Sequence, residues 1–224
     1  MLKMVAFDLD GTIGDTIPMC IRAFQKAVRP YTQRILSKDE IIQTFGLNEE
    51  GMIKQVVRNS NWEGALNDFY VIYKEAHITC SRPFDGIVEL IKELKAYSIS
   101  VVLITGKGEK SCSITLKQFE MDRCFDEIET GSPEKNRKSE AIKGLLIKHN
   151  LSFDEVIYIG DTVSDIKSCH EVGIKCLSAA WVASSKTIQQ LELYNKENVF
   201  YSIKSLRNFL MRKICSNQTT SRHQ

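Results

Sequence analysis

The sequence has few of the features that would place a protein in a membrane, in an oxidising compartment or on a nucleic acid. Its longest apolar runs, such as Val101 to Ile104, are far too short to span a bilayer. Its seven cysteines are scattered, with no CxxC pair and no secretory leader. A formal charge of +2 gives no overall field that would attract nucleic acid or an acidic membrane. We therefore predict a soluble cytoplasmic protein that binds neither nucleic acid nor a membrane.

Clusters of histidine and cysteine with metal-binding spacing are also missing, which disfavours zinc. We expect His77, His149 and His170 to be partly exposed structural residues. The composition, 43% hydrophobic and 26% charged, is typical of a globular protein. A chain of 224 residues can hold one domain with a substantial insertion, or two small domains.

Three short apolar runs, rich in β-branched residues, each end abruptly at a polar residue. Such runs are typical of strands that are buried on both faces of a parallel sheet. They are Met4 to Phe7 before Asp8, Val101 to Ile104 before Thr105, and Val156 to Ile159 before Gly160 and Asp161. Weaker strands are predicted at Phe125 to Glu129, Ile174 to Ser178 and Val199 to Phe200.

Helical apolar spacing follows these runs, for example in Gly86 to Tyr97 and Ser139 to His149. Strands that alternate with helices indicate an α/β fold with a doubly wound parallel sheet. Residues 15 to about 82 break the alternation because they contain helical patterns alone, with a capping box at Ser37 and Glu40. We predict an α/β core at 1–14 and 83–212, an inserted helical cap at 15–82, and a flexible polar tail at 213–224.

Carboxylates gather at the predicted strand ends, where parallel sheets bind ligands. Asp8 and Asp10 follow the first strand, and Asp161 and Asp165 follow the third apolar run. Uncompensated carboxylates a few ångströms apart repel by roughly 4 kcal/mol per pair at an effective dielectric constant of about 20. A hard cation with oxygen ligands would relieve this repulsion, and Mg²⁺, which can also bridge to a phosphate, is the natural choice.

The run Asp8-Leu9-Asp10-Gly11-Thr12 resembles the signature of the haloacid dehalogenase-like superfamily, and the other motifs follow in order over nearly the whole chain. The resemblance implies a Rossmann-like core, Asp8 as the nucleophile that becomes an aspartyl phosphate, and Asp10 as general acid and base. It further implies that Thr105 and Gly106 bind phosphate. Asp8, Asp10, Asp161 and Asp165 would form the metal site. Gly14 stands where relatives often carry a larger residue.

A phosphate-binding lysine completes this family pattern. Lys138 is our choice, because it begins a predicted helix and precedes Asp161 by 23 residues (161 minus 138), close to the family's usual spacing. Lys135 and Arg137 are near enough to be rivals, and the commoner Lys-Pro-x-Pro form is absent. Lys107, beside Thr105 and Gly106, is interpreted as a solvated surface charge.

The resemblance is to the branch that includes phosphoglycolate phosphatases, pyrophosphatases and β-phosphoglucomutases. It implies a Mg²⁺-dependent phosphatase that hydrolyses a small phosphorylated metabolite through an aspartyl phosphate. A phosphomutase is the alternative within the family. From other classes, a phosphoacceptor signalling domain disagrees with the motif order and the length, and a non-catalytic binding module disagrees with the intact acidic residues.

Overall fold

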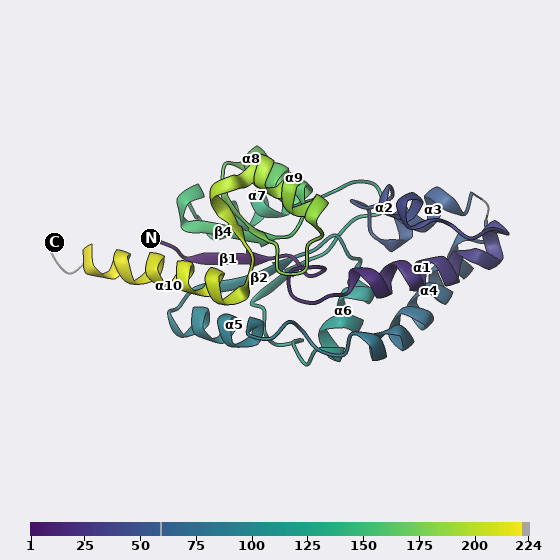
Figure 1. Cartoon of the computed structure of the whole chain (residues 1–224), viewed down its shortest axis with the longest axis horizontal. Coiled ribbons are helices and arrows are strands. Elements are labelled where there is room, and N and C mark those ends of the chain that lie inside the picture. The colour runs from purple at the N-terminus through teal and green to yellow at the C-terminus, as the bar shows by residue number, and fades with distance from the viewer. Residues whose placement is uncertain (59, 221–224) are drawn as a thin grey trace.

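The computed structural model describes residues 1–58 and 60–220, and its centre is a parallel β-sheet (Figure 1). The strand order is β3-β2-β1-β4-β5-β6. The strands are β1 (Met4–Phe7), β2 (Ser100–Ile104), β3 (Glu127–Glu129), β4 (Val156–Gly160), β5 (Lys175–Ala179) and β6 (Val199–Phe200). Every neighbouring pair is parallel, so the predicted α/β fold with a doubly wound sheet is confirmed.

The central strands are apolar throughout because helices cover both faces of the sheet. In β1, Val5 and Phe7 point into one hydrophobic cluster, whereas Met4 and Ala6 point into a second cluster on the opposite face. All four side chains are buried. A strand buried on both faces therefore needs no polar alternation, as the sequence predicted.

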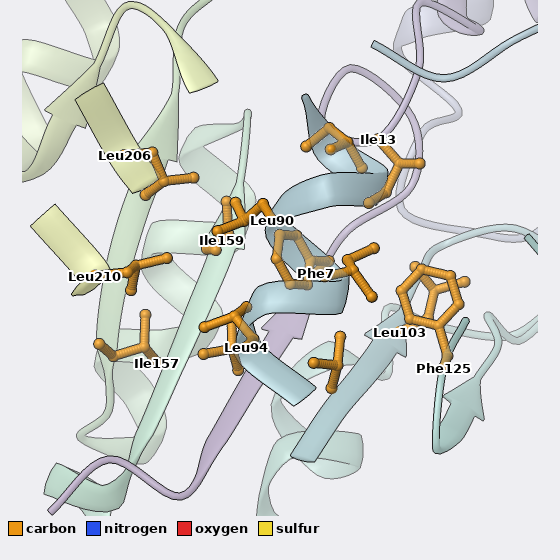
Figure 2. Close-up of a cluster of buried hydrophobic side chains, with 14 of the residues drawn as sticks. Phe7, Ile13, Leu90, Leu94, Leu103, Phe125, Ile157, Ile159, Leu206 and Leu210 are labelled. Atoms are coloured by element: carbon orange, nitrogen blue, oxygen red, sulfur yellow. The ribbon is translucent and has the colours of Figure 1, made fainter. Parts of the chain in front are cut away.

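Two groups of helices sandwich the sheet (Figure 1). On one face lie α5 (Ile87–Ala96) and α10 (Ile203–Thr220), and on the other lie α7 (Lys138–Lys148), α8 (Val163–Val172) and α9 (Ser185–Asn195). The helix α6 (Glu109–Gln118) follows β2. Figure 2 shows the first face, where α5 and α10 contribute apolar side chains above the strands, among them Leu90, Leu94, Leu206 and Leu210.

A block of helices lies between β1 and β2 in the chain and forms the right-hand end of the molecule in Figure 1. It comprises α1 (Ile17–Thr32), α2 (Lys38–Ile42), α3 (Glu49–Val56), α4 (Trp62–Ala76) and a 3₁₀ turn (His77–Thr79). The predicted capping box at Ser37 and Glu40 is present. The block has its own hydrophobic cluster, including Phe24, Phe69 and Tyr73. We refer to α1–α4 as the cap; the boundaries at 15 and 82 stay a prediction.

None of the helices within the described residues combines the length and hydrophobicity needed to span a bilayer.

Residues 213 to 220, which lie in the predicted flexible tail, belong to the helix α10. Leu206, Leu210 and Ile214 continue an apolar stripe against the sheet, and Ile214 is buried, whereas the flexibility of the tail stays a prediction. The rest of the tail, 221–224, lies outside the described residues. His77 is also buried rather than partly exposed, with its Nε2 3.0 Å from Thr115 Oγ1.

Gly14 lies against an aromatic ring, which explains why a larger residue is absent there. A Cβ atom at this position would come within 2.6 Å of the Phe119 ring. Because Phe119 is itself buried, we expect Gly14→Ala to lower the free energy of unfolding by about 1–3 kcal/mol, measured by urea denaturation.

Gly144 provides a matched control within α7, since a Cβ atom there would meet no other atom within 4 Å. Gly144→Ala should raise the free energy of unfolding by about 0.5–1 kcal/mol, because glycine is disfavoured in a helix interior. The same sign for both substitutions would contradict the steric account of Gly14.

Candidate active site

The polar residues predicted from sequence meet at one edge of the sheet. Asp8 follows β1, Thr105 follows β2 and Asp161 follows β4, and these three strands are neighbours. Because parallel strands end at the same edge, residues more than 150 positions apart in the chain (161 minus 8) reach one site. Asp8 and Asp161 both line a cavity of about 320 Å³ at this edge.

Lys138 joins two of the predicted carboxylates. Its Nζ donates hydrogen bonds to Asp8 Oδ2 at 2.7 Å and to Asp165 Oδ1 at 2.6 Å. Burial alone would lower the pKa of Lys138, but the carboxylates of Asp165 and Asp8 raise it well above its ordinary value. Lys138 is therefore held as a cation at the first turn of α7.

The rivals of Lys138 lie outside this cluster. Lys135 is paired with Glu140 on the surface, and its side chain is 61% exposed. Arg137 is also close to Glu140, with Nε 3.9 Å from its carboxylate. Neither residue lines the cavity, whereas Lys138 does.

Asp8 is buried and nearly surrounded by protein. Its Oδ1 accepts a hydrogen bond from the backbone amide of Leu9 at 2.8 Å. Burial raises the pKa of Asp8 to about 7, Lys138 opposes that shift, and the neighbouring carboxylates Asp165 and Asp10 add to it. The site thus holds more negative charge than its lysine compensates.

Asp165 is positioned by the start of α8. Its Oδ2 accepts hydrogen bonds from the backbone amide and the hydroxyl of Thr162, which closes a capping box with the Thr162 hydroxyl bound to the Asp165 amide. Its Oδ1 accepts from Lys138 and, at 3.2 Å, from the hydroxyl of Tyr158 on β4. These contacts engage both oxygens of the carboxylate and offset the cost of its complete burial.

Asp161 has a buried oxygen with no hydrogen-bond partner in the described part of the chain, its Oδ1. Burial, followed by the charges of Asp8 and Asp165, raises the pKa of this carboxyl well above its ordinary value. Gly11 allows the close approach: its φ is +76°, and a Cβ atom there would lie 2.2 Å from Asp161 Oδ2. A buried acceptor of this kind calls for a ligand.

A cation fits this arrangement. Side-chain oxygens of Asp8, Asp161 and Asp165 all lie within 4.8 Å of one another. An all-oxygen donor set with crowded negative charge suits a hard divalent ion such as Mg²⁺. The Asp10 carboxylate is not part of this group, although the sequence placed it in the metal site.

Asp10 turns instead toward the cap. Its Oδ1 accepts a hydrogen bond from the hydroxyl of Thr16 and lies 3.3 Å from Lys107 Nζ. Its side chain is 25% exposed and lines the cavity. The carboxylate is therefore fixed beside the group formed by Asp8, Asp161 and Asp165, and it faces the cavity that a ligand would enter.

Lys107 corrects a sequence expectation, because it is buried rather than a solvated surface charge. The carboxylate of Glu49, at the first position of α3, lies 3.9 Å from Lys107 Nζ, and the ring centre of Tyr73 is 4.5 Å away. Burial would lower the pKa of Lys107, but Asp10, as the nearest carboxylate, helps to raise it well above its ordinary value. Lys107 is a buried cation between the core and the cap.

Glu49 connects the cap to the core through uncharged partners as well. Its two carboxylate oxygens accept hydrogen bonds from the backbone amide of Gly108, at 2.8 Å, and the hydroxyl of Ser111, at 2.5 Å. Both donors lie at the start of α6, where the helix dipole also favours an anion. These bonds hold the start of α3 over the site.

The predicted phosphate-binding segment follows β2. Thr105 is buried, and its hydroxyl oxygen accepts a hydrogen bond from the backbone amide of Lys107 at 3.2 Å. Gly106 lines the cavity, and a Cβ atom on it would meet nothing within 4 Å. The segment leaves open space in front of its backbone, as an anion cradle requires.

Sequence reasoning missed Glu49, Tyr158 and Thr16 and misjudged Lys107. Tyr158 had a weak signal, since it is the polar side chain within an otherwise apolar strand. Glu49 gave none, because its partners lie 59 and 62 positions away, on a different element.

The chain is similar to several known proteins. A family model described as haloacid dehalogenase-like hydrolase matches residues 5–179. A pyrophosphatase PpaX from Bacillus mycoides is 22% identical, over 94% of this chain and 98% of that protein. A phosphoglycolate phosphatase from Vibrio cholerae is 26% identical, over 77% of this chain and 81% of that protein.

A solved structure shows the same fold. It is a haloacid dehalogenase-like family hydrolase from Streptococcus pneumoniae, with a TM-score of 0.71 and 24% identity, covering 93% of this chain and 98% of that one.

Proposed function

The chain belongs to the haloacid dehalogenase-like hydrolase family, and from this premise we propose that it is a Mg²⁺-dependent phosphatase acting on a small phosphorylated metabolite in the cytoplasm. The observation that carries the proposal is the environment of Asp8. This buried carboxylate lines the cavity, is held by Lys138, and stands beside the orphaned oxygen of Asp161. The proposed nucleophile Asp8, the cation of Lys138 and the unpaired acceptor oxygen of Asp161 therefore lie together, as phosphoryl transfer requires.

The first half of the proposed reaction forms a bond from an Asp8 oxygen to phosphorus and breaks the bond from phosphorus to the alcohol oxygen of the substrate. Asp10 donates its proton to that leaving oxygen. Thr16 and Lys107 hold Asp10 in place for this transfer. In the second half, Asp10 takes a proton from water, the water oxygen attacks phosphorus, and the bond to Asp8 breaks to release phosphate.

Charge on the phosphoryl oxygens is balanced by groups that the fold fixes in advance. Lys138 supplies a cation, and the open backbone at Gly106 can donate hydrogen bonds. Mg²⁺ held by Asp8, Asp161 and Asp165 would neutralise further negative charge on those oxygens. Preorganised charge of this kind is the main requirement of phosphoryl transfer.

The direct test is a screen of phosphorylated metabolites with added Mg²⁺, in which released phosphate is measured. Activity on phosphate monoesters is expected. Isomerisation of a sugar monophosphate without phosphate release would favour a mutase instead. A complete lack of turnover over the whole panel would contradict the proposed function.

Removal of the metal should abolish this activity. We expect EDTA to stop phosphate release and excess Mg²⁺ to restore it. Mg²⁺ at about 100 times its dissociation constant should also stabilise the fold by about 2.7 kcal/mol, measured as a shift of the thermal unfolding curve. Asp161→Asn should lose most of that stabilisation, because it removes a charged ligand. An equal shift in Asp161→Asn would contradict the assigned metal site.

A further inference from the structure

The cavity above Asp8 has two chemically different walls. The core wall carries most of the charged groups of the site, whereas the cap wall is apolar apart from Glu49. The apolar cap side chains that line it are Ile17, Cys20, Ile42, Phe45, Leu47 and Met52, and the cap also contributes Gly46 and the buried Glu49 carboxylate. A substrate whose phosphoryl group lies at Asp8 would place its leaving group against this second wall.

Apolar side chains at the mouth of the cavity are left uncovered. Ile42 is 40% exposed and Phe45 is 42% exposed, and both line the cavity. They come from the end of α2 and the loop that follows it. Exposed apolar surface that borders a polar site marks a place where an apolar group of a ligand gains by binding.

The cations of the cavity are already engaged. Among its described lining residues, the positively charged side chains are Lys107 and Lys138. Lys138 is bound by Asp8 and Asp165, and Lys107 is buried between Asp10 and Glu49. Both lysines therefore lie on the core wall or where that wall meets the cap. None of the described cap residues that line the cavity is positively charged.

A second anionic group on the substrate would be poorly placed in this cavity. It would lie against apolar side chains, with the Glu49 carboxylate also lining the space. Transfer of a charge from water to such surroundings without a partner is costly, and a nearby like charge adds repulsion.

From these observations we propose that the leaving group of the substrate is an uncharged alcohol with an apolar body, rather than one that carries a carboxylate or a second phosphate. The inference rests on the proposed function and narrows its substrate class. It predicts that this chain prefers a different class of substrate from phosphoglycolate and pyrophosphate, the substrates named for its relatives. The discrimination comes from the cap wall, whereas the reacting groups of the core are unaffected.

Matched pairs of monoesters test the proposal with the full-length chain and Mg²⁺. The first pair is phenyl phosphate and 4-carboxyphenyl phosphate; the second is 2-hydroxyethyl phosphate and phosphoglycolate. Within each pair the uncharged member should have a kcat/KM at least about 10-fold higher, since its binding leaves no unpaired charge. Preference for the charged members would overturn this inference while supporting the phosphatase. No turnover of any ester would overturn the proposed function, and the inference with it.

A cation introduced on the cap wall should weaken or cancel the discrimination. In Phe45→Arg, the ratio of kcat/KM for phosphoglycolate to that for 2-hydroxyethyl phosphate should rise at least about 10-fold, mainly through KM. Ile35→Arg is the matched control, because Ile35 is a 64% exposed cap residue that does not line the cavity. An unchanged ratio in Phe45→Arg, with circular dichroism showing a folded protein, would overturn the placement of the leaving group.

Discussion

Asp8→Asn should reduce Mg²⁺-dependent phosphate release by at least about 10³-fold, since it removes the proposed nucleophile while almost preserving the shape of the side chain. The amide cannot accept the phosphoryl group as a carboxylate does, and it weakens the ion pair with Lys138 Nζ, now 2.7 Å from Asp8 Oδ2. Steady-state release of phosphate from phenyl phosphate measures the effect. Labelling with a ³²P-phosphomonoester should give an acid-stable phosphoprotein only where Asp8 is intact.

Asp15→Asn is the control for this substitution. Asp15 lies in the same loop after β1 but is exposed and does not line the cavity. Its replacement should leave the rate unchanged, because it removes a negative charge near the site without touching the reacting groups. Undiminished turnover in Asp8→Asn would rule out the aspartyl phosphate.

The fold and much of the candidate site could be predicted from sequence, because both depend on local patterns. Strands buried on both faces leave continuous apolar runs, and the residue after each run lies at the ligand-binding edge of the sheet. This places Asp8, Thr105 and Asp161 without any knowledge of the packing. The geometry also joins Lys138 to Asp8, although its catalytic role stays a prediction.

The contacts between cap and core could not be predicted in this way. Lys107 looks exposed in sequence because it lies in a polar, glycine-rich turn, and it is buried because Glu49 and Tyr73 of the cap close over it. Such burial depends on how the cap packs against the core, and no local sequence periodicity predicts it. For the same reason, the sequence does not predict the apolar cap wall, which forms where α1, α2 and α3 lie over the carboxylates.

Replacement of Lys138 should affect both stability and rate. Lys138→Met removes the cation that lies between Asp8 and Asp165 and leaves the buried carboxylates facing one another. We expect the free energy of unfolding to fall by about 3 kcal/mol, as when one partner of a buried ion pair is removed. Phosphate release with Mg²⁺ present should fall by about 10²–10³-fold, since the variant lacks a fixed donor to the phosphoryl oxygens. Urea denaturation in EDTA and steady-state kinetics in Mg²⁺ measure the two effects separately.

Lys135→Met provides the comparison that decides between the two lysines. Lys135 is three positions earlier and is equally positive, but its partner Glu140 is on the surface. Exposed ion pairs contribute less than about 1 kcal/mol, so this variant should unfold nearly as the parent does and keep its rate. A larger loss of activity in Lys135→Met than in Lys138→Met would transfer the phosphate-binding role to Lys135. Retention of full activity by both variants would leave Asp8 without its proposed cationic partner and would contradict the charge balance on which the mechanism depends.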